Sequence, residues 1–163
     1  MADEGEFPKI DGDVLYGSEV NNFIRNEDLS GITPTNTGGW ATVPTDLANI
    51  VDGDITTSTN TFQVSNGGGG GYINIDLGYS KVRPFVMVKY EIVADASSSG
   101  VIVEVSNDNS NWGTVTSLSE SGNGVYSLGG FVLESGYSAI RYVRIKFDDG
   151  TGQTGKVYLV QVY

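Results

Sequence analysis

Apolar and polar residues alternate with a period of two through most of the second half of the chain. This alternation is the pattern of β-strands that bury one face. Clusters of Asn, Asp, Gly and Ser separate the alternating runs and indicate tight turns. The pattern predicts seven strands: Tyr72–Leu77, Phe85–Val93, Val101–Val105, Trp112–Leu118, Val125–Leu133, Ile140–Phe147 and Lys156–Tyr163.

The first part of the chain has a different character. Residues 31–71 contain no long periodic segment, and Thr, Asn, Gly and Pro dominate there. Upstream, Val20, Phe23 and Ile24 are spaced i, i+3, i+4, which predicts a small helix with one apolar stripe. A helix of two turns is not stable by itself, so the stripe must pack on its own domain or on a neighbouring subunit.

These patterns together predict an all-β protein. Strands joined by short turns, with no helix-length periodicity between them, are typical of an antiparallel β-sandwich. We therefore expect a β-sandwich domain at residues 32–163, preceded by an attachment or assembly arm at residues 1–31. The apolar residues expected to serve assembly in the arm are Val14, Leu15, Tyr16, Val20, Phe23 and Ile24.

Composition excludes several classes of function. The 163 residues include 20 acidic and 9 basic side chains, and the net charge of −11 disfavours a nucleic-acid backbone or an anionic membrane surface as partner. The absence of Cys and His excludes disulfides, zinc ribbons, thiol nucleophiles and a histidine base. No apolar run is long enough for membrane insertion, and the start of the chain shows no signal peptide. We therefore expect a non-catalytic protein that is made in the cytoplasm.

Four segments resemble discoidin domains, the coagulation-factor C-type domains. They are residues 48–57 (ANIVDGDITT), 72–78 (YINIDLG), 103–112 (VEVSNDNSNW) and 141–145 (RYVRI), and they occur in the order found in that family. The resemblance implies a jelly roll of the galactose-binding-like type. It also implies non-catalytic attachment to sugars, lipid head groups or proteins through loops at one end.

Three aromatic residues are candidates for ligand contact. Trp112 follows a turn and could stack on a sugar, although packing under the hairpin is the more common role of such a residue. Trp40 lies in a polar region beside Gly38 and Gly39, where it would contact a ligand or a neighbouring subunit, or cover the sandwich as a lid. Phe62 stands near the place where the family commonly has a Trp.

One loop is a candidate calcium site. Asp52, Asp54 and Thr57 could supply hard oxygen ligands on a tight loop, together with backbone carbonyls near Ala48 and Ile50. The resemblance implies a further ligand from the last strand, where Gln161 replaces a Glu. The alternative is an Asx-type turn in which the two carboxylates bind amides of their own loop.

The two arginines of the sequence RYVRI should face opposite ways, because they are three positions apart on one strand. Arg144 is expected to face solvent. Arg141 is expected to face the core side, where it would need a carboxylate partner, unless a bulge redirects it.

Residues 9–22 resemble the opening segment of many tailed-phage fibre and appendage proteins. Together with a surface-type domain and no export signal, this resemblance suggests a virion structural protein, either a capsid decoration or a fibre or tail appendage. Its partners would be other virion proteins, copies of itself in a trimer, and a host-surface glycan. The main alternative is a stand-alone or secreted carbohydrate-binding module in an extracellular location, and the third is a purely architectural sandwich.

Overall fold

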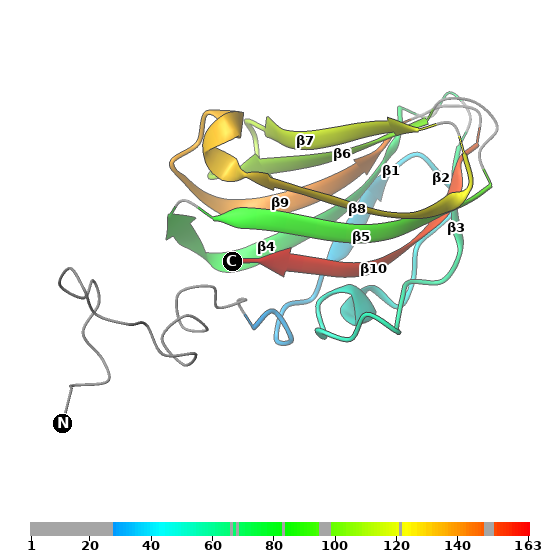
Figure 1. The fold of residues 1–163 in the computed structure, drawn as a ribbon, viewed down its shortest axis with the longest axis horizontal. Helices are drawn as coiled ribbons and strands as arrows, with labels where there is room; N and C mark the ends of the chain where they lie inside the picture. Colours follow the sequence, from blue (N-terminus) through cyan, green and yellow to red (C-terminus); the bar gives the residue numbers. More distant parts are fainter. Residues whose placement is uncertain are drawn as a thin grey trace, which may run out of the picture.

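The computed structural model describes residues 28–65, 67, 69–82, 84–94, 99–120, 122–148 and 152–163. These residues form two packed antiparallel sheets (Figure 1). The first sheet has the order β1-β4-β9-β6-β7 and the second has the order β2-β3-β10-β5-β8. The strands are β1 (Thr35–Gly38), β2 (Trp40–Thr42), β3 (Phe62–Val64), β4 (Gly71–Val82), β5 (Phe85–Ala94), β6 (Ser99–Ser106), β7 (Gly113–Glu120), β8 (Gly124–Phe131), β9 (Ala139–Phe147) and β10 (Thr154–Val162).

The prediction of an antiparallel β-sandwich is confirmed. Each of the seven strands expected from alternation is present, with ends shifted by a few residues. Three short strands, β1, β2 and β3, lie in the region that shows no periodicity, because strands of three or four residues are too short to display one. Two single 3₁₀ turns, η1 (Leu47–Ile50) and η2 (Val132–Ser135), complete the described elements.

The core fills the space between the two sheets. It is built from the inward positions of the alternating strands, so Ile73, Ile75, Val143 and Ile145 of the first sheet face Val86, Val88 and Tyr90 of the second. Leu29 also belongs to this core, and Ile32 packs against it. Packing of the sandwich thus begins before residue 32. The predicted small helix and the assembly residues Val14, Leu15, Tyr16, Val20, Phe23 and Ile24 lie outside the described residues.

Trp40 closes one end of the core. Its ring meets Phe62 edge to face at 5.2 Å between centroids and lies 6.1 Å from the ring of Phe147. The indole N–H donates to the carbonyl of Thr37 at 2.9 Å, which fixes the ring in place. A Cβ at Gly71 would lie 2.5 Å from this ring, so only glycine lets the indole lie against β4.

We therefore expect Gly71→Ala to destabilise the sandwich. The added methyl group must displace a ring held by two aromatic neighbours and a hydrogen bond, which costs about 1–3 kcal/mol of unfolding free energy. Urea unfolding followed by fluorescence measures this loss. Gly100→Ala is the matched control, because Gly100 also lies in a strand but its Cβ would make only ordinary contacts, at 3.5 Å or more. Equal effects of the two changes would contradict the proposed packing of Trp40.

Candidate ligand-binding hollow and oxygen-rich loop

The outer face of the first sheet carries a ladder of polar and aromatic side chains. β4 and β9 are paired so that Tyr72 lies beside Lys146, Asn74 beside Arg144 and Asp76 beside Tyr142. These are the polar positions of the alternation that buries Ile73, Ile75, Val143 and Ile145 on the other face. The period of two therefore determines both the core and this polar face.

Arg144 is held at the centre of that face. Its guanidinium carbon lies 4.0 Å from the centre of the Trp112 ring and 4.8 Å from that of Tyr72. Its Nε donates to Glu104 of the neighbouring strand β6 at 2.7 Å. Both side chains of this ion pair are largely covered, with 21% and 14% of their surfaces exposed. Stacking and the ion pair together fix the position of Trp112.

Arg141 also lies on the outer side, because the pairing of β4 with β9 shifts register between Asp76 and Lys81. Arg141 therefore does not face the core, as it would on a regular strand. The prediction allowed for a bulge that redirects this side chain, and the register shift is such an irregularity. Arg141 donates from two nitrogens to Asp76 at 2.8 and 2.9 Å. The hydrogen bond from Arg141 holds the pKa of Asp76 below its usual value, so Asp76 is ionised at neutral pH.

A hollow of about 140 Å³ opens on this face, between β1, β4, β9 and the turn after β6. It is lined by Thr33, Thr35, Asn74, Ile75, Asp76, Asn109, Trp112 and Tyr142. Its volume is well below the roughly 300 Å³ of small drug-binding pockets. The volume suits one ring-sized group inside the hollow.

The turn that forms one wall is rigid. Asp108 accepts hydrogen bonds from the backbone N–H groups of Ser110 and Asn111 and from two side chains, those of Ser106 and Asn111. These hydrogen bonds lower the pKa of Asp108 far below its ordinary value, and the bond from the backbone N–H of Asn111 contributes most. Asn109 has a positive φ of 60°, an uncommon backbone conformation for a residue other than glycine. Within the described part of the chain, its side-chain amide forms no hydrogen bond and is free for a ligand.

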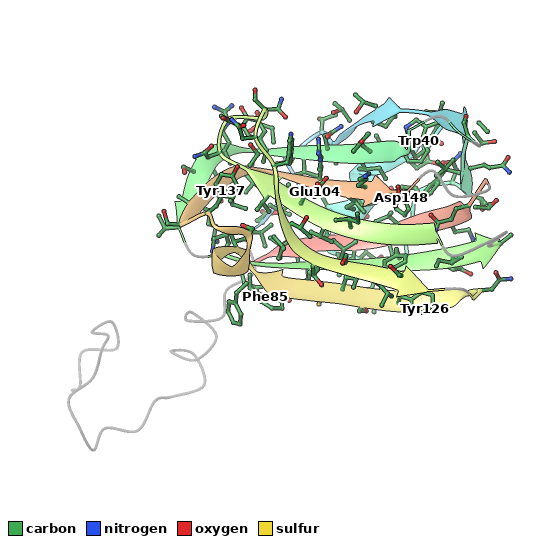
Figure 2. The ribbon with its side chains drawn as sticks, turned by 90° about the horizontal axis from the view of Figure 1, so that it is seen from above. Trp40, Phe85, Glu104, Tyr126, Tyr137 and Asp148 are labelled. Atoms are coloured by element: carbon green, nitrogen blue, oxygen red, sulfur yellow. The ribbon has the colours of Figure 1, made fainter. Side chains whose placement is uncertain are left out.

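Of the three predicted ligand contacts, only Trp112 lines the hollow. Trp40 covers the core end instead, and Figure 2 shows it away from Glu104, which marks the Arg144 ladder. Phe62 is fully buried between Trp40 and Phe147, so the expectation that it contacts a ligand is wrong. Sequence reasoning missed Asn74, Asp76, Asn109 and Tyr142, although the first two occupy polar positions of a recognised alternating strand.

The loop after η1 gathers oxygen atoms around one hydroxyl. The Oγ1 of Thr57 lies 2.9 Å from Oδ2 of Asp52, 3.0 Å from the carbonyl oxygen of Asp54 and 3.3 Å from that of Asn49. A hydroxyl carries one proton and can donate to only one of these acceptors. The other contacts bring acceptor oxygens together without a donor. This hard, oxygen-only set suits a calcium ion.

The predicted calcium ligands are distributed differently from what we expected. The carboxylate of Asp54 turns away and accepts from the N–H and hydroxyl of Thr56, which together hold the pKa of Asp54 below its usual value. Asp54 thus offers its carbonyl oxygen rather than its carboxylate. The Oε1 of Gln161 accepts from the hydroxyl of Tyr163 at 2.8 Å. Both hydrogen bonds of the Asx-type alternative are present, because the N–H of Asp54 donates to Oδ1 of Asp52 and the N–H of Thr56 donates to Oδ1 of Asp54.

Two absences among the described residues bear on function. No group of three or more His, Cys, Asp and Glu side chains is close enough there to hold a metal ion. A metal in the loop would thus depend on carbonyl and hydroxyl oxygens. None of the described helices is long and apolar enough to cross a membrane.

Solved structures of similar shape are carbohydrate-binding modules. A point mutant of chitosan-binding module 1 from a chitosanase/glucanase of Paenibacillus sp. IK-5 is 22% identical, covers 85% of this chain and 99% of its own, and has a TM-score of 0.58. The module CpGH89CBM32-5 of Clostridium perfringens, solved with GalNAc-β-1,3-galactose, is 16% identical over 85% of this chain and 99% of its own, with a TM-score of 0.54. The chain has the fold of these carbohydrate-binding modules.

The family 32 module of C. perfringens NanJ, solved with galactose, is a third example. It is 13% identical, covers 84% of this chain and 96% of its own, and has a TM-score of 0.52. No protein-family model and no curated protein matches the chain. The galactose-binding-like architecture implied by the discoidin resemblance is thus confirmed, whereas the resemblance of residues 9–22 to phage proteins stays a prediction.

The two arginine pairs allow a matched test of the ladder. Arg144→Met leaves Glu104 largely covered and without its ion-pair partner and removes the cation between two rings, so we expect a loss of about 2 kcal/mol of unfolding free energy. Arg141→Met breaks a pair whose side chains are 44% and 47% exposed and should cost much less, because solvent screens an exposed pair. Denaturant unfolding measures both. Equal costs would show that Arg144 does not fix the ladder.

Proposed function

We propose that this protein is a non-catalytic carbohydrate-binding module that holds one sugar ring in the hollow on the outer face of the first sheet. The observation that carries the proposal is the composition of the hollow. Aromatic surfaces of Trp112 and Tyr142 stand beside amide, hydroxyl and carboxylate groups of Asn74, Asn109 and Asp76. A sugar ring presents apolar C–H faces and polar hydroxyl edges, and it needs both kinds of partner.

Several polar groups in the hollow are available to a ligand. The Asn74 amide nitrogen donates to Thr37, which leaves its oxygen as an acceptor, and the Asn109 amide is free. Asp76 is held in place by Arg141 and stays ionised, so its oxygens can only accept. Fixed acceptors of this kind bind sugar hydroxyls without a large ordering cost.

The charge of the chain favours neutral or amine-bearing sugars over acidic ones. A net charge of −11 repels polymers of uronic or sialic acid at low salt. The solved neighbours, one named a chitosan-binding module and two bound to galactose or a galactose-containing disaccharide, supply suitable probes. Galactose, N-acetylgalactosamine and glucosamine oligomers are therefore the first ligands to test.

Binding is tested by titrating these sugars into ¹⁵N-labelled protein. We expect the amide signals of Asn74, Asp76, Asn109 and Tyr142 to shift together for at least one sugar. Asn109→Gly removes the free amide while keeping the positive φ, so it should weaken affinity about tenfold without unfolding the turn. Val125→Ser, an exposed change on the other sheet, is the control. Shifts confined to other parts of the sandwich, or unchanged affinity of the Asn109 variant, would overturn this site.

The virion role is a further part of this proposal. It places the module on a particle surface through residues 1–31, and it is supported by the phage-like pattern at residues 9–22 alone. The hypothesis of a carbohydrate-binding module is also supported by the fold, so we rank it above the virion hypothesis. Both readings bring the sandwich into contact with glycans outside the cell.

We also propose that the loop after η1 binds calcium through Asp52, Thr57 and the carbonyl oxygens of Asn49 and Asp54. Acceptor oxygens that lie close together around Thr57 repel one another, and a cation at their centre would offset this repulsion. Its role would be structural, because Thr59, just beyond the loop, is hydrogen-bonded to Val157 of β10 through its N–H and its hydroxyl.

Calcium binding predicts a higher melting temperature in CaCl₂ than in EDTA or MgCl₂. Asp52→Asn should abolish this increase, since Asp52 supplies the one carboxylate that contacts Thr57. Asp54→Asn should retain most of it, because only the carbonyl of Asp54 faces the cluster. A melting temperature that ignores calcium in the unaltered protein would overturn the proposal, and an equal loss in both variants would overturn the assignment of ligands.

A further inference from the structure

Three aromatic side chains form a ridge on the outer face of the second sheet, at one end. Phe85 meets Phe131 edge to face at 5.0 Å between ring centroids, and the ring of Tyr163 lies 6.1 Å from that of Phe85. They come from adjacent strands, because β5 lies between β8 and β10. Phe85 lies across Gly129, where a Cβ would come within 2.8 Å of its ring. We call Phe85, Phe131 and Tyr163 the aromatic ridge.

The ridge is not explained by packing within the described sandwich. Phe131 is 58% exposed, and no described element covers it. Elsewhere the same face carries polar contacts: Lys89 lies over the ring of Tyr158, and Tyr158 donates to Glu91. The exposed Val125 stands apart from the ridge, at the other end of β8. A cluster of three aromatic rings gathered at one end of a sheet face is typical of a surface that another segment covers.

We propose that the apolar stripe of Val20, Phe23 and Ile24 in the same chain covers this ridge. The stripe has the spacing of one helix face and needs an apolar partner. The described chain begins beside the C-terminal end of β10 (Figure 1), and Figure 2 shows Phe85 at the same end of the sandwich. The backbone of Tyr163, directly after β10, is hydrogen-bonded to that of Phe85. The end of β10 in Figure 1 and Phe85 in Figure 2 therefore mark the same place on the sandwich.

The length of the connection agrees with this occupant. Leu29 is buried in the core, which anchors the chain directly after the stripe. The four Cα-to-Cα steps from Ile24 to Asp28 can span about 14 Å, whereas the three strands of the ridge are about 10 Å wide. The far end of β8 at Val125 is about 20 Å further along the sheet and out of reach. The tether also gives the stripe a high effective concentration at the ridge relative to a second copy.

The chain contains no cysteine, so one spin label can be attached at a chosen place. We would label Asn22→Cys, which points away from the stripe on a helix, and record paramagnetic broadening in the full-length ¹⁵N-labelled protein. The expected result is that the amides of Phe85, Phe131 and Tyr163 lose most of their intensity. Amides of Trp112 and Arg144 on the opposite sheet should keep theirs. Weak broadening spread evenly over both sheets would overturn the proposal.

Two variants and one mixing experiment sharpen this test. Phe131→Ser and Phe23→Ser should each abolish the selective broadening, whereas Val125→Ser, which is 56% exposed at the other end of β8, should preserve it. Circular dichroism confirms that each variant is folded. We then mix spin-labelled protein at natural isotope abundance with ¹⁵N-labelled protein that carries no spin label. This mixture should give no broadening. Broadening in the mixture would mean that a second copy supplies the stripe, which overturns docking within one chain.

Discussion

Strand β9 lies at the centre of the first sheet, between β4 and β6, and each of its residues must serve one of two opposite surfaces. Its inward side chains, Val143, Ile145 and Phe147, are fully buried in the core. Its outward side chain Arg144 stacks between Tyr72 and Trp112 and pairs with Glu104. The period of two therefore couples the stability of the sandwich to the arrangement of the candidate ligand surface.

The register shift between β4 and β9 shapes the surface next to the ladder. Without the register shift, Arg141 would be on the core side and Asp76 would have no bidentate partner. With it, Arg141 holds Asp76 in the lining of the hollow, while the Asp108 turn holds Asn109 there. Both residues are held in place by the protein itself, which would reduce the ordering cost of binding a ligand. The hollow is small, at about 140 Å³, which agrees with the proposed recognition of one ring.

The two sheets differ in how their outer faces are used. The first sheet carries paired charges and stacked rings across its centre, whereas the second has paired polar groups in the middle and the aromatic ridge at one end. Ligand recognition and attachment of the N-terminal segment would then occur on opposite sides of one domain. Such a separation would leave the hollow uncovered when the N-terminal segment is attached to the other face.

The sequence by itself determined the sandwich, because the seven longer strands each bury one face and alternation shows this directly. It also indicated the loop with Asp52 and Thr57 and the Trp112 turn. The short strands β1 to β3 and the burial of Phe62 could not be predicted, since they depend on partners far along the chain. Only the tertiary structure brought Asn74, Asn109 and Tyr142 to one hollow and redirected Arg141. Register and bulges depend on pairing between distant strands, and no local pattern specifies them.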